Sequence, residues 1–401
     1  MKILIKSATL FLPTVGWGIN QDLYIDDSQL SLTAPQNFKP DRIIDASNQW
    51  VLPAMVDLHT YPCPPNQLNP DKAIRHELAS ALKSGFSQIV IPPNILIPKN
   101  RDPSPQIFKL GALSHQLEES HLNDLNGMSE NGYIGFTMAD KPIKNLKLLR
   151  QFYQYAASFN YKIAIQPIEP SFSYHGVVNE GVISERTGMS GVPAIAEAIA
   201  ISQQLLLIED TGITAHFSGV STHQAVELIS SAQSKGLKVT ADTIMSHLHL
   251  TEIDCAEFDS NCFVYPPLRT EMDRVALLKG INDGVINAIS SYHVPLTQED
   301  KLAPFKDCKP GISSIDTFLS LGYKLVLRDE LSFKTLINAI SNSPRAIFNL
   351  PQSQDIIIFD PNVEWIPSED TLLSKGLNNP FCGFPLPGKI SEVLFLDKLT
   401  S

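Results

Sequence analysis

Residues that could bind a metal ion or transfer a proton follow several short apolar runs in this sequence. The run at residues 51–56 leads into Asp57 and His59, and Glu169 follows a later run. Further histidines stand at or near the ends of three other runs: His216, His247, His249 and His293. Several imidazoles and carboxylates that converge on one or two zinc ions can acidify a bound water for hydrolysis, whereas a lone ligand binds weakly. The pattern therefore supplies candidate groups for metal-assisted hydrolysis.

The same residues also have a structural interpretation. Asp57 and His59 could cap the end of a strand and satisfy each other's hydrogen bonds. The four later histidines could lie in the core or along a cleft, and Glu169 could be solvated or paired with a basic group. Residue types alone leave both interpretations open.

Short apolar runs alternate with amphipathic segments from residue 51 to about residue 349. The runs predict strands at residues 51–56, 87–91, 132–136, 162–165, 213–216, 237–241, 262–264 and 284–289. The amphipathic segments predict helices at residues 72–84, 143–159, 192–211, 222–235 and 273–283. Strands that alternate with helices form parallel sheets. Eight such strands match a (β/α)8 TIM barrel, although periodicity alone does not separate a barrel from a doubly wound sheet.

Both ends of the chain show a different pattern. Residues 2–12 and 21–32 predict strands, as do residues 353–359 and 390–396. We expect the two sets to pair into a small β-sandwich-like domain formed from both chain termini, with the barrel inserted between them. The expected division gives residues 1–50 and 350–401 to the small domain and residues 51–349 to the barrel.

The composition is that of a globular protein, with 43% hydrophobic and 18% charged residues. The net charge of −11 argues against a nucleic-acid partner and against an anionic membrane surface, because both require basic patches. No apolar run approaches the roughly 20 residues of a membrane helix, and residues 1–13 predict a strand rather than a signal peptide. The five cysteines are widely spaced, which favours free thiols in a reducing cytoplasm.

Four segments carry a resemblance to a known family. Residues 57–61 read Asp-Leu-His-Thr-Tyr, and residues 191–197 read Gly-Val-Pro-Ala-Ile-Ala-Glu. Pro-Pro-Leu-Arg at 266–269 is followed by Asp273, and Ser-Lys-Gly-Leu-Asn-Asn-Pro-Phe occupies 374–381. Together these segments resemble the metal-dependent amidohydrolases, and more narrowly the dihydroorotases. The resemblance covers nearly the whole chain and implies a TIM barrel with its chemistry at the carboxyl ends of the strands.

Most metal-binding positions of that family hold other residues here. The resemblance places family ligands at His59 and Glu169, and both are present. Four further positions are histidines in the family and a fifth is the catalytic aspartate; here they are, in that order, Tyr61, Gln166, Gly219, Ser246 and Tyr292. A phenol ionises near pH 10 and replaces an imidazole poorly. We therefore expect no catalytic residue, no metal site and no zinc cofactor.

The positions that bind the substrate are also altered. The resemblance assigns an arginine to Cys63, a histidine to Leu296 and an asparagine to Tyr265, whereas the asparagine at Asn94 is kept. Without a cation, burial of a substrate carboxylate would cost several kcal/mol, so we expect no substrate binding. We expect the rings of Tyr61, Tyr265 and Tyr292 to fill the old cavity rather than to form a new ligand pocket.

Some bacterial members of the family are inactive chains that assemble with aspartate transcarbamoylase, and this chain resembles them. The resemblance implies a non-catalytic, structural subunit of a hetero-oligomer in pyrimidine biosynthesis, which contacts its partner through the helical exterior and loops and could also self-associate. One alternative is a dihydroorotase or another cyclic-amide hydrolase with a degenerate mononuclear site at His59 and Glu169. Another is a metal-free sensor that binds a small molecule in the cleft near Asn94.

Overall fold

Eight parallel strands form the central sheet of the protein in the computed structural model, which describes residues 2–13, 15–63, 70–93, 95–98, 103–118, 121–141, 144–173 and 176–396. In chain order and in spatial order they are β6 (Met55–Asp57), β7 (Phe86–Ile91), β8 (Gln106–Ala112), β9 (Tyr133–Thr137), β10 (Lys162–Ile165), β13 (Thr214–Phe217), β14 (Val239–Ile244) and β15 (Ala288–Ser290). Beyond β15, His293 forms a parallel bridge with Thr60, and its carbonyl accepts the Tyr61 N–H at 2.9 Å. These contacts join the last strand to the first, so the sheet is a nearly closed TIM barrel.

The predicted barrel architecture is correct, but one of the eight predicted strands is misplaced. Residues 262–264 form no strand, because Ser260–Cys262 is a short 3-10 turn that leads into a loop. The missing member is β8, which the sequence did not reveal. Its first four residues are exposed or partly exposed, and only its last three are buried. A strand of this kind has no continuous apolar run to mark it.

The predicted strand at residues 51–56 divides between two sheets. β5 (Trp50–Pro53) pairs with strands of the small sheet, and β6 begins the barrel two residues later. Between them, the Ala54 carbonyl accepts hydrogen bonds from the Ser341 hydroxyl and the Arg345 guanidinium, both at 3.0 Å. These bonds fix the chain where it enters the barrel and so position the residues that follow β6.

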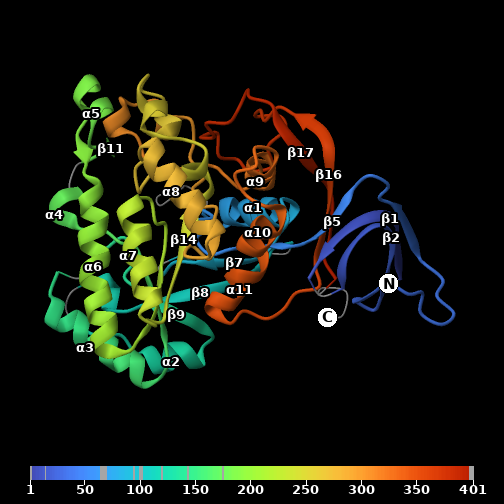
Figure 1. Ribbon diagram of the computed structural model, residues 1–401, viewed down its shortest axis with the longest axis horizontal. Helices are drawn as coiled ribbons and strands as arrows, with labels where there is room; N and C mark the ends of the chain where they lie inside the picture. The colour runs from blue at the N-terminus through green and yellow to red at the C-terminus, as the bar shows by residue number, and fades with distance from the viewer. Residues whose placement is uncertain are drawn as a thin grey trace.

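Helices cover the outside of the barrel (Figure 1). The five predicted helices are present as α1 (Pro70–Lys83), α3 (Leu146–Ser158), α6 (Ala194–Thr211), α7 (His223–Ser234) and α8 (Glu271–Asn282). The others are α2 (Leu125–Glu130), α4 (Pro170–Ser173), α5 (Val182–Thr187), α9 (Phe318–Leu327), α10 (Phe333–Ile337) and α11 (Ser343–Phe348). Side-chain caps mark several of the starts, among them Thr222 at α7 and Thr270 with Asp273 at α8. The main apolar core lies between these helices and the strands.

Seven strands form a second sheet at one end of the molecule (Figure 1). They are β1 (Ile3–Leu12), β2 (Gly16–Asp26), β3 (Gln29–Ser31), β4 (Arg42–Asp45), β5, β16 (Ile356–Trp365) and β17 (Leu386–Leu394). The order is β17-β16-β5-β1-β2-β3, with β4 beside β1, so strands from both ends of the described chain lie in one sheet. Alternate residues of β1 are buried in a separate apolar cluster that includes Ile5, Leu23 and Ile358. The domain boundaries and the sandwich-like form stay predictions.

Two smaller features complete the fold. A two-stranded ladder of β11 (Val178–Asn179) and β12 (Gly191–Val192) precedes α6.

The five cysteines, all among the described residues, form no disulfide. Burial raises the pKa of the Cys255 thiol to about 12, so this thiol stays protonated and unreactive. Within the described ranges, no helix is both long and apolar enough to cross a bilayer.

Candidate functional site

The barrel strands open at their carboxyl ends into a cleft of about 740 Å³. Its described lining comes from the segments that follow β6, β9, β10, β14 and β15 and from the loop before Pro266. Tyr61, Tyr265 and Tyr292 all belong to this lining. The expectation that the three tyrosines fill the old cavity is therefore wrong: they form part of its wall and leave it open.

Tyr292 lies against His59, the imidazole at a position where the resemblance predicts a family ligand. Its ring stacks on His59 with 4.0 Å between ring centroids and 5° between ring planes. Its hydroxyl points at Gly219, where a Cβ atom would lie 2.4 Å from the hydroxyl oxygen. Tyr292 thus occupies the space into which a side chain at residue 219 would project, and the two positions are sterically coupled.

Both phenols at the old ligand positions are neutral. Burial raises the pKa of Tyr61 and of Tyr292 above the usual value of 10.0, and nearby carboxylates raise each further. Tyr292 also takes a left-handed backbone conformation with φ of 48°, which costs a residue other than glycine about 1–2 kcal/mol. Its hydroxyl has no hydrogen-bond partner among the described residues. A buried, neutral and unpaired phenol is a poor metal ligand.

His216 forms a buried pair that the sequence did not predict. Its Nε2 lies 3.0 Å from Asp242 Oδ2, and its Nδ1 lies 2.9 Å from the Thr240 hydroxyl. The second oxygen of Asp242 accepts the Gly219 N–H at 2.7 Å. Both ring nitrogens of His216 are therefore engaged, as the structural interpretation requires. The only sequence signal for Asp242 was a carboxylate at the end of an apolar strand.

The expected contact between Asp57 and His59 is met in part: the backbone N–H of His59 donates to the Asp57 carboxylate and lowers its pKa, although burial raises that pKa overall. The Asp57 carboxylate accepts hydrogen bonds from the Ser291 N–H at 2.8 Å and from the hydroxyls of Ser291 and Thr60. Asp57 therefore ties the first barrel strand to the last. Burial lowers the pKa of His59 to about 4, although the nearby Asp242 carboxylate opposes the shift, so His59 is neutral at pH 7.

The histidines after β14 are tied to backbone carbonyls. His247 Nε2 lies 3.0 Å from the Pro266 carbonyl, and His249 Nε2 lies 3.1 Å from that of Leu321. Burial lowers the pKa of these two residues to about 4 and about 3. Ser246 contributes only a hydroxyl to the cleft, 3.4 Å from His247 Nδ1.

His293 is a structural residue as well. The Ser314 N–H donates to its Nδ1 at 3.1 Å, which leaves the Nε2–H to donate to Glu77 at 3.2 Å. Glu77 also accepts the Lys375 N–H at 2.9 Å. Burial opposes ionisation of Glu77, but the bonds from His293 and its neighbours lower the net pKa of this carboxyl.

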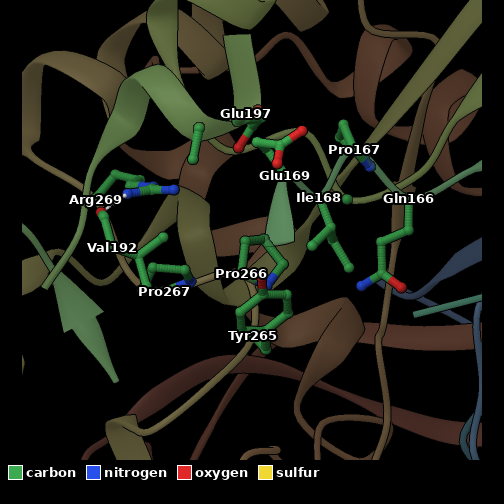
Figure 2. A pocket seen from close by; sticks show the side chains of 12 residues that line it. Gln166, Pro167, Ile168, Glu169, Val192, Glu197, Tyr265, Pro266, Pro267 and Arg269 are labelled. Atoms are coloured by element: carbon green, nitrogen blue, oxygen red, sulfur yellow. Dashed lines mark hydrogen bonds between the residues drawn. The ribbon is translucent and has the colours of Figure 1, made fainter. Parts of the chain in front are cut away.

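Glu169 lies in a second, smaller cavity of about 20 Å³ beside the cleft. Its carboxylate accepts hydrogen bonds from the N–H and hydroxyl of Ser171. Figure 2 shows this cavity with Gln166 and Arg269 on opposite sides. Gln166 and Tyr265 line both cavities, whereas His59 lines only the large one. The described geometry does not place the two surviving ligand positions in one cavity.

Arg269 and Glu197 line the small cavity and belong to a buried polar network. Arg269 donates to Asn179 Oδ1 at 2.8 Å, to the Val192 carbonyl at 2.7 Å and to the Ser221 hydroxyl at 3.2 Å. The Ser221 hydroxyl and N–H donate to Glu197. Burial raises the pKa of Glu197, and the Arg269 guanidinium opposes that shift. The motif at 266–269 is therefore kept for a structural reason.

The segment 374–381 also has a structural role. Asn378 donates to the carbonyls of Val294 and Gly311, both at 2.9 Å, and accepts the Leu296 N–H at 2.8 Å. These bonds hold the loop after β15, and that loop supplies one wall of the cleft.

Of the positions that the resemblance assigns to substrate binding, some line the cleft and others do not. Leu296 and Tyr265 line the cleft. Cys63 does not; it packs against the main core, and burial raises the pKa of its thiol. Asn94 lies outside the described residues. Among the lining residues that were not anticipated, Asp140 and Lys309 carry charged side chains. Both lie in irregular loop segments, where no periodic pattern points to them.

These residues do not fit a zinc ion. The described chain holds no group of three or more His, Cys, Asp or Glu side chains placed to bind a metal. At the mouth, the His59 ring is stacked under Tyr292, and the nitrogens of His216 are bonded to neighbours. The arrangement can hold a ligand in a largely apolar cleft, but it lacks the converging donors that would activate water.

Comparisons with known proteins agree with this architecture. No family model matches the chain. It is 32% identical to a dihydroorotase-like protein of Pseudomonas putida and 31% identical to a dihydroorotase of Syntrophus aciditrophicus, in each case over 98% of both chains. Solved structures of a D-hydantoinase and of the L-hydantoinase of Arthrobacter aurescens match with a TM-score of 0.81. They share 19% and 21% identity over 99% and 98% of this chain and 94% of theirs, and so support the fold alone. With this barrel, these retained motifs and these relatives, the chain belongs to the dihydroorotase and dihydroorotase-like family of the amidohydrolase superfamily.

Proposed function

We propose that this chain is a non-catalytic member of its family and serves as a structural subunit beside aspartate transcarbamoylase in pyrimidine biosynthesis. The observation that carries the proposal is the contact among Tyr292, His59 and Gly219. One neutral phenol covers the remaining imidazole and takes the space of a ligand side chain. A barrel altered in this way keeps its exterior for assembly and lacks the groups for hydrolysis.

A cytoplasmic location belongs to the same proposal. The five cysteines form no disulfide, as expected of a chain in a reducing compartment. The barrel exterior offers several exposed apolar side chains that a partner could cover, among them Leu206 on α6 and Met272 and Val275 on α8. The proposal does not depend on a particular one of these surfaces.

Association with the transcarbamoylase is tested by producing this chain together with the aspartate transcarbamoylase catalytic chain of the same organism. We expect the two to elute as one complex in size-exclusion chromatography with light scattering. The cleft variants His59→Gln and Tyr292→Phe serve as matched controls. They should assemble like the wild type, because the proposed contact lies on the exterior. Two chains that elute separately at micromolar concentration would defeat the proposal.

The alternative is a dihydroorotase or other cyclic-amide hydrolase with a mononuclear site at His59 and Glu169. These residues line different cavities, and Glu169 is engaged by Ser171. Metal analysis and a dihydroorotate hydrolysis assay, run on the chain after incubation with zinc and desalting, separate the two candidates. We expect far less than one zinc per chain and no turnover. One zinc per chain, with turnover that His59→Ala abolishes, would favour the hydrolase.

A further inference from the structure

A third cavity, of about 400 Å³, shares no described lining residue with the cleft or with the small cavity beside it. Its described lining comes from two 3-10 turns and their neighbours, Ser260–Cys262 and Glu299–Lys301, and from the chain between β16 and β17. Pockets of about 300–1,000 Å³ enclose small organic ligands, so this cavity is large enough for one.

One buried cation without an ion-pair partner lines this cavity. Lys301 is 9% exposed, and it is the one Lys or Arg in the described lining. Its ammonium donates to the carbonyls of Ser260 at 2.7 Å and of Phe263 at 3.3 Å, and it forms no ion pair within the described chain. An ammonium has three N–H donors, so one remains. Because buried charges are normally paired, this cation indicates an anionic ligand.

Neighbouring acids do not neutralise this charge by contact. Burial lowers the pKa of Lys301 to about 8, although the nearby carboxylates of Asp259 and Asp300 oppose the shift. The amine is therefore still mostly protonated at pH 7. Asp300 is paired instead with Lys309, whose amine lies 2.8 Å from its carboxylate. The ammonium of Lys301 thus remains available to a carboxylate that enters the cavity.

Hydrogen bonds between the two turns fix the position of Lys301. The Ser260 hydroxyl donates to the Lys301 carbonyl at 2.8 Å, and the Lys301 amine donates back to the Ser260 carbonyl. The Thr297 hydroxyl donates to the Asp300 carboxylate at 3.0 Å. A cation that is already held in place loses little side-chain entropy when a ligand binds.

The rest of the described lining suits an aliphatic body with a single negative charge. Leu302, Leu372 and Leu377 supply apolar surface, and Leu302 is 70% exposed. Glu369 is the one carboxylate of this lining, and it is exposed. Its charge disfavours a second negative charge on the ligand.

We propose that this cavity binds a short aliphatic monocarboxylate. The carboxylate accepts a hydrogen bond from the Lys301 ammonium, and the aliphatic chain packs on Leu302 and Leu377. The side-chain amides of Asn261 and Gln298 line the same cavity and supply donors for the second carboxylate oxygen. The acid is bound and not transformed. This inference goes beyond the structural role proposed above and stands whether or not the chain binds the transcarbamoylase.

Ligand binding to the full-length chain at pH 7 tests the inference. The probes are hexanoate, its uncharged analogue hexanamide, and two anions without the aliphatic chain, acetate and inorganic phosphate. A ligand that prefers the folded state raises the unfolding midpoint, and we expect hexanoate to raise it. By calorimetry hexanamide should bind about tenfold more weakly, because a charge-assisted hydrogen bond is roughly twice as strong as a neutral one. Acetate and phosphate should also bind about tenfold more weakly or worse, because they lack the apolar contacts.

Removal of the cation tests the assigned contact. Lys301→Met keeps a side chain of similar length and removes the buried charge together with the cost of burying it, so the circular dichroism spectrum should not change. Hexanoate should bind this variant about tenfold more weakly, whereas hexanamide should bind it as it binds the wild type. Lys279→Met is the matched control, because Lys279 is exposed on α8; its binding of hexanoate should equal that of the wild type.

A second variant tests the apolar wall without touching a buried residue. Leu302→Ala should weaken hexanoate binding by about threefold, through lost apolar contact, and leave acetate binding unchanged. Leu327→Ala, at an exposed residue of α9, is its control. The inference is overturned if hexanoate does not bind at millimolar concentration or if hexanamide or phosphate binds as tightly. It is also overturned if Lys301→Met and Leu302→Ala both bind hexanoate like the wild type, which would place the acid elsewhere.

Discussion

Two buried polar regions border the small cavity of this barrel, and they differ in how their hydrogen bonds are satisfied. In the network of Arg269, Ser221 and Glu197 each side chain is paired. At the mouth, the hydroxyl of Tyr292 and the amide oxygen of Gln166 lack partners among the described residues. Arg269 of the motif at 266–269 belongs to the first region, and the resemblance predicts altered family positions, Tyr292 and Gln166, in the second.

The physical reason is the cost of an unpaired buried group. Removal of one member of a satisfied network leaves its partner buried without compensation, which costs about 1–3 kcal/mol, and more when the partner is charged. A buried polar atom that has no partner leaves no other group uncompensated when it is replaced, so its replacement should cost little stability. Four predictions, ordered by expected effect, test this difference.

The largest effect is expected from the paired network. Arg269→Met leaves the buried Glu197 carboxylate without its guanidinium and should lower the free energy of unfolding by about 3–5 kcal/mol. Arg150→Met is the matched control, because Arg150 forms an exposed ion pair with Asp210 at 2.6 Å. That variant should lose about 1 kcal/mol or less. Urea unfolding followed by circular dichroism measures both, and equal losses would contradict the contrast.

The buried neutral histidines should make the fold sensitive to acid. In the folded chain the pKa of His247 is about 4, whereas in an unfolded chain a histidine titrates near 6.5. The unfolded state therefore binds more protons as the pH falls from about 6.5 toward 4, and stability is lost over that window, by about 2 kcal/mol near pH 5 for one such residue. Urea unfolding at several pH values measures the slope.

His247→Gln should reduce this slope, because it removes one group that must be protonated on unfolding. The control His121→Gln replaces an exposed side chain and should leave the slope unchanged. A slope that both substitutions leave unaltered would show that other groups cause the acid sensitivity.

The contact between residues 219 and 292 gives the third prediction. Gly219→Ala places a Cβ atom 2.4 Å from the Tyr292 hydroxyl at a position with φ of +69°. Gly212→Ala is the control: it has the same φ of +69°, and no atom lies within 4 Å of its Cβ. Both variants bear the backbone cost of about 1 kcal/mol, and Gly219→Ala should lose about 1–3 kcal/mol more through overpacking. In a Tyr292→Ala background this excess should disappear, as a double-mutant cycle of thermal unfolding can measure.

The smallest effect distinguishes unpaired from paired hydroxyls. Tyr292→Phe removes a buried hydroxyl without a partner in the described chain, so the ligand-free protein should gain stability or remain within about 0.5 kcal/mol. Tyr153→Phe removes a hydroxyl bonded to Gln204 at 2.5 Å and should lose about 1 kcal/mol. A clear loss in Tyr292→Phe, equal to that in Tyr153→Phe, would mean that the hydroxyl at the mouth is satisfied within the protein.

Much of the fold was predictable, because a buried strand and an amphipathic helix each leave a pattern of residue types. Seven of the eight barrel strands and the five helices carried that pattern. β8 did not, because only its last three residues are buried. Residues 262–264 carried it without forming a strand, since their apolar side chains pack in a separate cluster under the loops that includes Phe305 and Ile312.

The candidate site was predictable in its chemistry and not in its shape. The resemblance predicts that Tyr61, Gly219 and Ser246 stand where the family has imidazoles, and this assignment stays a prediction. Whether three tyrosines fill a cavity or line it depends on how their rings lie against His59 and the barrel wall. The sequence predicted that the three tyrosines fill the cavity, whereas in the packed structure they line a cleft that stays open.

The sequence by itself carried the prediction that this barrel lacks the donors for a zinc ion, because ligand chemistry is a property of residue type. It also determined the scaffold, because apolar periodicity and capping residues are local. Only the tertiary structure decided that the Tyr292 hydroxyl occupies the space beside Gly219, that Asp242 pairs with His216, and that a cleft remains. These outcomes depend on distances between residues from different strands, which close packing across the barrel sets and no local pattern records.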